Sequence, residues 1–136
     1  MWPPETPYLT VDGIVKIFNP TFKGIVLIKR KNPPLGFALP GGFVDRGESV
    51  ESALFREMKE EIGVDVKIEK LLGVYSSPKR DPRLHTASCV YVCSADKIPV
   101  AGDDAKEAYI YRLEEIPWDK LVFDHAKILE DFIKAV

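Results

Sequence analysis

The side chains best suited to chemistry are three glutamates near the middle of the chain, Glu57, Glu60 and Glu61. On a helix, residues three and four apart are neighbours, so all three carboxylates would lie on adjacent parts of one face. Most acidic helix faces are simply solvated, but this one borders an apolar stripe and follows a glycine-rich loop. Clustered carboxylate oxygens without a thiol or imidazole partner favour a hard cation, Mg²⁺ or Mn²⁺.

The element that must carry these glutamates is predicted as a helix over residues 49–62. Ser49 can cap its N-terminus, and Gly63 suits the left-handed position after its last turn. An apolar stripe recurs at every fourth residue, at Leu54, Met58 and Ile62. This stripe would bury one side of the helix and leave the acidic face beside it.

The rest of the chain alternates between predicted strands and loops. Segments rich in β-branched and aromatic residues predict strands over residues 9–18, 24–30, 37–40, 66–76, 86–93 and 107–113. A second helix is expected after a cap at Asp124, with an apolar face formed by Ile128, Leu129, Phe132, Ile133 and Val136. Strands interspersed with two helices predict the α/β fold class, with a mixed β-sheet covered by helices.

The acidic segment also carries a family resemblance. Residues 42–64, GFVDRGESVESALFREMKEEIGV, resemble the Nudix box, G-x5-E-x7-R-E-U-x-E-E-x-G-U, where U is a bulky aliphatic residue. The specified positions are filled by Gly42, Glu48, Arg56, Glu57, Met58, Glu60, Glu61, Gly63 and Val64. Only Met58 is a soft match, because it is apolar but unbranched. The order of strands and helices is also similar to the Nudix α/β/α sandwich, so we expect one Nudix domain over residues 1–136.

The resemblance implies hydrolysis of a nucleoside diphosphate linked to another group, with metal ions neutralising charge and activating water. It implies Glu57 and Glu61 as the main metal ligands, with Glu60 as a helper or ligand. The backbone carbonyl of Gly41, just before the box, is implied as a further ligand. Arg56 is implied to be structural, because a guanidinium can hold neighbouring carboxylates in position.

The general base is a separate question, because some Nudix enzymes take it from a loop or strand downstream of the box. Glu107 is the favoured candidate, with the nearby Asp103 and Asp104 as further candidates. The alternative for Glu107 is a solvated surface acid.

Two features favour the ADP-ribose pyrophosphatase branch of the family. In that branch a proline follows the box by about fifteen residues, and Pro78 lies 15 residues after Gly63. The segment LLGVYSSPKRDPRLHTASCVYV also looks like members with that activity. The alternatives are clearance of oxidised or non-standard nucleoside triphosphates and a non-catalytic ADP-ribose sensor.

Candidate substrate-binding residues flank the box on both sides. Arg80 and Arg83 can neutralise a diphosphate or contact a terminal ribose, although loop arginines are often merely solvated. Phe37 and Phe43 can stack on adenine, although aromatic residues in strands more often belong to the core.

Charge and composition exclude several classes of protein. The chain has 21 acidic and 19 basic side chains, which argues against a general nucleic-acid binder. No apolar run reaches the length of a membrane span, and the N-terminus lacks the basic and apolar regions of a signal peptide. We therefore expect a cytoplasmic protein with a small nucleotide substrate and, from the resemblance, a homodimer. The absence of Gln and the presence of only two Asn point to a thermophilic source.

Overall fold

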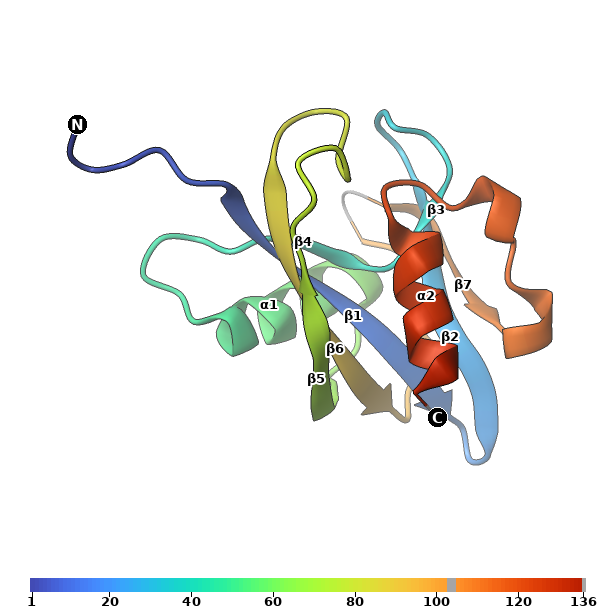
Figure 1. The fold of residues 1–136 in the computed structure, drawn as a ribbon. Coiled ribbons are helices and arrows are strands. Elements are labelled where there is room, and N and C mark those ends of the chain that lie inside the picture. Colours follow the sequence, from blue (N-terminus) through green and yellow to red (C-terminus); the bar gives the residue numbers. More distant parts are fainter. Residues whose placement is uncertain (103–104, 136) are drawn as a thin grey trace.

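The computed structural model describes residues 1–102 and 105–135 and shows a single sheet between two helices (Figure 1). The strands are β1 (Tyr8–Phe18), β2 (Phe22–Arg30), β3 (Phe37–Ala38), β4 (Gly41–Phe43), β5 (Lys67–Tyr75), β6 (Thr86–Ala95) and β7 (Ala105–Tyr111). The helices are α1 (Val50–Ile62) and α2 (His125–Lys134), preceded by the short 3₁₀ turns η1 (Leu113–Glu115) and η2 (Trp118–Lys120).

The sheet is mixed, as the sequence predicts. Its strands run in the order β3-β2-β1-β6-β5, while β4 also pairs with β1 and β7 with β2. The pairing of β1 with β6 is parallel, from Tyr8 opposite Thr86 to Ile17 opposite Ala95, and the other pairings are antiparallel. The parallel pair brings together residues about 80 positions apart in the chain, which no local sequence signal reveals.

Helix α1 covers one face of the sheet and forms for the predicted reasons. The Ser49 hydroxyl accepts a hydrogen bond from the backbone N–H of Ser52, and Gly63 ends the helix in the left-handed conformation with φ of 69°. Leu54, Met58 and Ile62 are completely buried against the sheet. Burying this stripe leaves the side of α1 that carries Glu57 and Glu61 beside β4 rather than in open solvent.

Helix α2 covers the opposite face, which completes the α/β/α sandwich. Ile128, Leu129 and Phe132 pack there with Ile14 of β1, whereas the next residue, Val15, belongs to the core under α1. This alternation follows from the two-residue period of a strand. Of the predicted apolar face, Val136 lies outside the described residues.

Two local predictions need correction. Asp124 occupies the N-cap position of α2, but its side chain makes no cap hydrogen bond, because its carboxylate binds Arg80 instead. The strand expected over residues 37–40 is shorter than predicted, because β3 ends at Ala38. A further strand, β4, follows at Gly41–Phe43, and the sequence does not suggest it. In β4, Gly41 pairs with Asp12 of β1.

Residues 1–7 precede β1 as an exposed arm that runs away from the body of the molecule (Figure 1). Among the described residues, neither helix is long and apolar enough to cross a membrane.

Candidate active site

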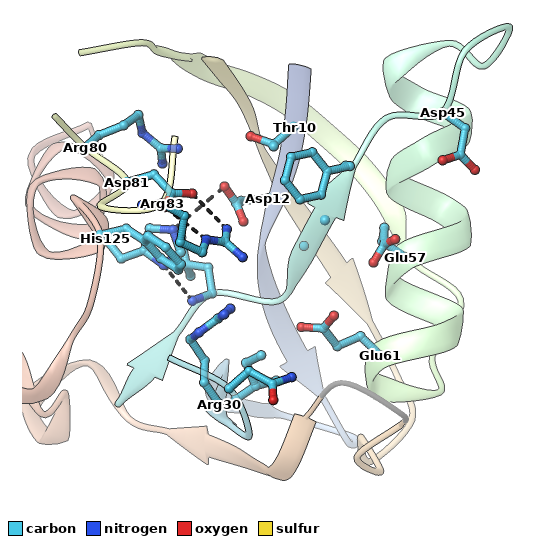
Figure 2. A pocket seen from close by; sticks show the side chains of 17 residues that line it. Thr10, Asp12, Arg30, Asp45, Glu57, Glu61, Arg80, Asp81, Arg83 and His125 are labelled. Atoms are coloured by element: carbon cyan, nitrogen blue, oxygen red, sulfur yellow. Dashed lines mark hydrogen bonds and ion pairs between the residues drawn. The ribbon is translucent and has the colours of Figure 1, made fainter. Parts of the chain in front are cut away.

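A cavity of about 340 Å³ lies between the start of β4, helix α1 and the loop that precedes β6 (Figure 2). Glu57 and Glu61 of α1 reach it from one side, and we call this side the carboxylate wall. Three arginines also line the cavity, and we call them the arginine wall. Arg30 ends β2, and Arg80 and Arg83 lie in the loop before β6. A negative wall opposite a positive wall suits a ligand that carries both a cation and an anionic group.

The carboxylate wall holds two of the three box glutamates. The Glu57 side chain is 13% exposed and Glu61 is 6% exposed, and both line the cavity. Glu60 differs from them: its side chain is 60% exposed and is not part of the lining. Two poorly solvated carboxylates one helical turn apart repel each other. A cation between them would relieve this repulsion.

Two glycines allow the β4 backbone to lie close to the carboxylate wall on one side and to β1 on the other. A Cβ atom at Gly42 would lie 2.5 Å from the Glu57 carboxylate, and one at Gly41 would lie 2.2 Å from both Asp12 Oδ1 and the Val11 carbonyl oxygen. Only glycine allows so close an approach at either position.

The oxygen donors at this point fit a hard divalent cation. The residues that the structure describes contain no ready-made cluster of three His, Cys, Asp or Glu side chains that could hold a metal ion. Mg²⁺, however, is usually held by one or two protein carboxylates and takes its remaining ligands from water and substrate phosphates. Glu57, Glu61 and a backbone carbonyl at Gly41 are a donor set of that kind.

Arg56 organises the acids around the start of α1. Its Nε and Nη2 atoms donate to the two carboxylate oxygens of Glu48 at 2.7 and 2.9 Å, and its Nη1 donates to Glu57 at 2.7 Å and Glu60 at 3.2 Å. Nη2 also donates to the backbone carbonyl of Phe43. The hydrogen bonds from Arg56 lower the pKa of Glu48 to about 2. Arg56 therefore fixes the Glu57 carboxylate and joins α1 to the end of β4.

A buried polar cluster forms the floor of the cavity. Asp12 Oδ2 accepts a hydrogen bond from the Ser88 hydroxyl at 2.5 Å and lies 3.8 Å from His125 Nε2. His125 Nδ1 accepts a hydrogen bond from the Leu39 backbone N–H at 2.9 Å. Burial lowers the pKa of His125 to about 3 and raises the pKa of Asp12 to about 6. His125 is therefore neutral at pH 7, and it ties the start of α2 to the backbone that leads into β4.

Neither Asp12 nor His125 is among the site residues that the sequence predicts. One signal was present for Asp12: it is the only charged residue within the apolar segment from Leu9 to Val15. A buried acid in such a segment needs partners and often marks a functional site.

The two predicted arginines both line the cavity but differ in how accessible they are to a ligand. Arg80 lines the cavity, but its side chain is 4% exposed and its guanidinium donates to both Asp124 oxygens and to the Thr86 hydroxyl. Arg83 is 39% exposed and is held by Asp81 through two hydrogen bonds of 2.8 and 3.0 Å. Arg83 is therefore the more accessible of the two for a ligand.

The predicted aromatic and proline residues also differ in whether they line the cavity. Phe43 lines the cavity and lies 5.9 Å from the Arg83 guanidinium carbon. Phe37 is not part of the lining and packs edge-to-face against Tyr109 and Tyr111. Pro78 is exposed and also lies outside the lining.

The structure places Glu107 away from the cavity. Its exposed carboxylate accepts a hydrogen bond from the Tyr109 hydroxyl, and it is not among the lining residues. The other two base candidates, Asp103 and Asp104, lie outside the described residues.

Several known proteins resemble this chain in sequence and in fold. The chain is 51% identical to the ADP-ribose pyrophosphatase of Methanocaldococcus jannaschii over 131 residues, which cover 94% of this chain and 74% of the relative. A MutT/nudix family protein from Enterococcus faecalis superposes with a TM-score of 0.86 at 32% identity, over 100% of this chain and 64% of that chain.

A third relative is a bifunctional NMN adenylyltransferase/ADP ribose pyrophosphatase from Francisella tularensis, solved in complex with AMP and a Mn ion. It superposes with a TM-score of 0.79 at 28% identity, over 98% of this chain and 43% of that chain. The NUDIX domain model matches residues 7–132, which include every described residue of both walls. The chain therefore belongs to the Nudix domain family.

Proposed function

We propose that the protein is a divalent-metal-dependent pyrophosphohydrolase that cleaves ADP-ribose to AMP and ribose 5-phosphate. The observation that carries the proposal is the cavity with a carboxylate wall opposite an arginine wall. A diphosphate cannot approach the carboxylates unless a cation lies between them, whereas it can bind the arginines directly. The 51% identical relative that is named an ADP-ribose pyrophosphatase supports this substrate.

Glu57, Glu61 and the Gly41 carbonyl would hold the cation, with Glu60 as a helper at the exposed edge. When bound, the cation would neutralise phosphate charge and lower the pKa of water. The chain's own residues position these groups: Arg56 holds the Glu57 carboxylate, and His125 holds the Leu39 backbone two residues before Gly41. Arg83, backed by Asp81, would orient the diphosphate.

The test is a comparison of two glutamine variants. Glu57→Gln removes one negative ligand without changing side-chain size, so we expect ADP-ribose hydrolysis to fall by about a thousandfold or more. Glu130→Gln, at an exposed position of α2, is the matched control and should keep full activity. AMP and ribose 5-phosphate are measured by chromatography with Mg²⁺ present. Wild-type protein that releases no AMP refutes the proposed function, and full activity of Glu57→Gln refutes the metal assignment.

Two assays test the substrate and the base. Faster turnover of 8-oxo-dGTP than of ADP-ribose would favour the nucleotide-clearance alternative. Glu107→Gln tests whether the exposed glutamate on β7 supplies the general base. Its position outside the cavity lining predicts that the variant keeps most of its activity.

Four further properties belong to the same proposal. The natural metal is Mg²⁺, with Mn²⁺ able to replace it. Metal titration of the metal-free protein tests this.

The protein is a homodimer, because Trp2 and Tyr8 expose 89% and 60% of their surface, and a partner subunit would bury these exposed aromatic side chains. It is cytoplasmic, in keeping with the free thiols of Cys89 and Cys93. A thermophilic source predicts a high melting temperature. Light scattering, localisation and calorimetry test the last three.

A further inference from the structure

Phe123, just before α2, has a backbone conformation that aromatic residues seldom adopt. Its φ of 58° is the only positive value found for a non-glycine residue within the described ranges 1–102 and 105–135. A residue of this kind persists in the left-handed region only when its surroundings enforce it, and such residues concentrate at functional sites. The contacts around Phe123 enforce this conformation and give it a role at the cavity.

The neighbours of Phe123 are fixed on both sides. The Val122 backbone N–H donates to the Phe37 carbonyl at 2.9 Å, which joins this segment to β3. The Asp124 carboxylate is held by Arg80 through two hydrogen bonds of 2.7 and 3.0 Å. The chain must therefore turn at Phe123 itself, and the turn directs its ring to the cavity, which it lines.

The ring of Phe123 lies against two guanidinium groups. The guanidinium carbon of Arg30 is 5.0 Å from the ring centroid, and that of Arg83 is 5.4 Å away. The face of an aromatic ring attracts cations within about 6 Å. Two guanidinium groups repel each other. Attraction of both to the Phe123 ring offsets this repulsion and holds them at the same wall.

Each arginine is also restrained from a second direction. Arg30 Nε donates to the Pro34 carbonyl at 2.9 Å, and Arg83 is held by both Asp81 oxygens. An arginine side chain held in this way loses less freedom when it binds an anion. The two guanidinium groups thus line the cavity in fixed positions, across from Glu57 and Glu61.

We propose that Phe123 is a positioning residue that holds Arg30 and Arg83 as a preformed pair for the diphosphate of the substrate. This inference rests on the proposed function and deepens it by naming the group that binds the anion opposite the carboxylate wall. Each phosphate of a diphosphate can accept hydrogen bonds from a guanidinium, so two such groups at one wall can bind two neighbouring phosphates. Phe123 acts through the arginines, so its effect belongs to substrate binding and not to the chemical step.

The experiment compares Phe123→Leu with Phe123→Tyr. Leucine keeps an apolar side chain but removes the ring, so we expect KM for ADP-ribose to rise about tenfold while kcat stays within about twofold. Tyrosine keeps the ring and should restore KM to within about twofold of wild type. Phe22→Leu, at an exposed aromatic residue that begins β2, is the control and should leave both constants unchanged. Melting temperatures are recorded for all three variants.

A double-mutant cycle separates positioning from simple packing. Arg83→Lys keeps the positive charge but loses the planar guanidinium group. If Phe123 acts through Arg83, Phe123→Leu should raise KM much less in the Arg83→Lys background than in the wild type. An unchanged KM in Phe123→Leu, failure of Phe123→Tyr to restore it, or additive effects in the cycle would each overturn the proposal.

Calorimetric titration of ADP-ribose without added metal separates this inference from the proposed function. If the wild type binds ADP-ribose in this titration but releases no AMP in the assay with Mg²⁺, the proposed function fails. The comparison of the dissociation constants of wild type and Phe123→Leu then decides the role of Phe123. Weaker binding by Phe123→Leu supports the positioning role, and equal binding or no binding by either protein overturns it.

Discussion

Gly42 offers a sharp test of whether the position of the Glu57 carboxylate limits the reaction. An alanine Cβ at this position would lie 2.5 Å from Glu57 Oε2, whereas ordinary van der Waals contact begins at 3.4 Å. The carboxylate must therefore move by about 0.9 Å, and its hydrogen bond to Arg56 restricts how it can do so. A displacement of about 1 Å at a reacting centre can lower a rate by about a hundredfold.

We therefore expect Gly42→Ala to lower kcat/KM for ADP-ribose by about a hundredfold, or about 2.7 kcal/mol of transition-state stabilisation. The atoms that must move belong to the end of a flexible side chain, so the free energy of unfolding should change by no more than about 1 kcal/mol. Initial rates at saturating Mg²⁺, a Mg²⁺ titration and urea unfolding measure these quantities. The Mg²⁺ titration should shift to higher concentration.

Two other glycines provide the comparison. Gly73→Ala meets nothing closer than 3.5 Å and should leave activity and stability unchanged. Gly41→Ala would meet the Val11 carbonyl oxygen at 2.2 Å and the Asp12 Cα at 2.9 Å, so it should separate β4 from β1 and destabilise the protein. If Gly42→Ala keeps kcat/KM within about threefold of wild type, the position of Glu57 does not limit catalysis and the reasoning is refuted.

Three further predictions concern Arg56, His125 and Leu54. Arg56→Lys replaces a planar fork that bonds several acids by a single ammonium, so kcat/KM should fall by about tenfold or more. The pKa of Glu48, now about 2, should rise toward 4.5 in an NMR titration, and an unchanged value would contradict the role of Arg56. Between pH 6.5 and about 3, His125 is protonated in the unfolded chain but not in the folded chain. The free energy of unfolding therefore falls by up to about 1.4 kcal/mol for each unit by which the pH is lowered. Asp12, with its pKa raised to about 6, opposes this fall because the folded chain protonates it before the unfolded chain does. Urea unfolding at pH 7 and pH 5 should show a smaller loss of stability in His125→Asn than in wild type. Equal losses would contradict a buried neutral histidine. Leu54→Ala opens a cavity under α1 and should lower the free energy of unfolding by about 2–5 kcal/mol; a loss below about 1 kcal/mol would show that the site collapses.

The features that the sequence predicted well are those determined by neighbouring residues. The cap at Ser49, the apolar stripe of α1 and the left-handed Gly63 are local, and the structure confirms each of them. The placement of Glu57 and Glu61 on one face follows from helix geometry alone. The family resemblance also rests on one continuous segment, and the match over residues 7–132 confirms it.

Local patterns were misleading where a distant partner competes for the same side chain. Asp124 has the type and position of a helix cap, but Arg80, 44 residues earlier, takes its carboxylate. Phe37 resembles a stacking residue next to the box, but Tyr109 and Tyr111 of β7 pack against it because β3 and β7 both pair with β2. In each case the outcome depends on which strands lie side by side, and local sequence carries no information about that.

The sequence by itself determined the helix that carries the acids, the box around it and hence the family. Only the tertiary structure decided what stands opposite those acids. Arg30, Arg83 and Phe123 come from β2, the loop before β6 and the turn before α2, and they meet because the sheet order brings these elements to one end of the molecule. The physical reason is that a helix and its caps depend on contacts within a few residues, whereas a binding wall depends on contacts between segments up to 93 residues apart.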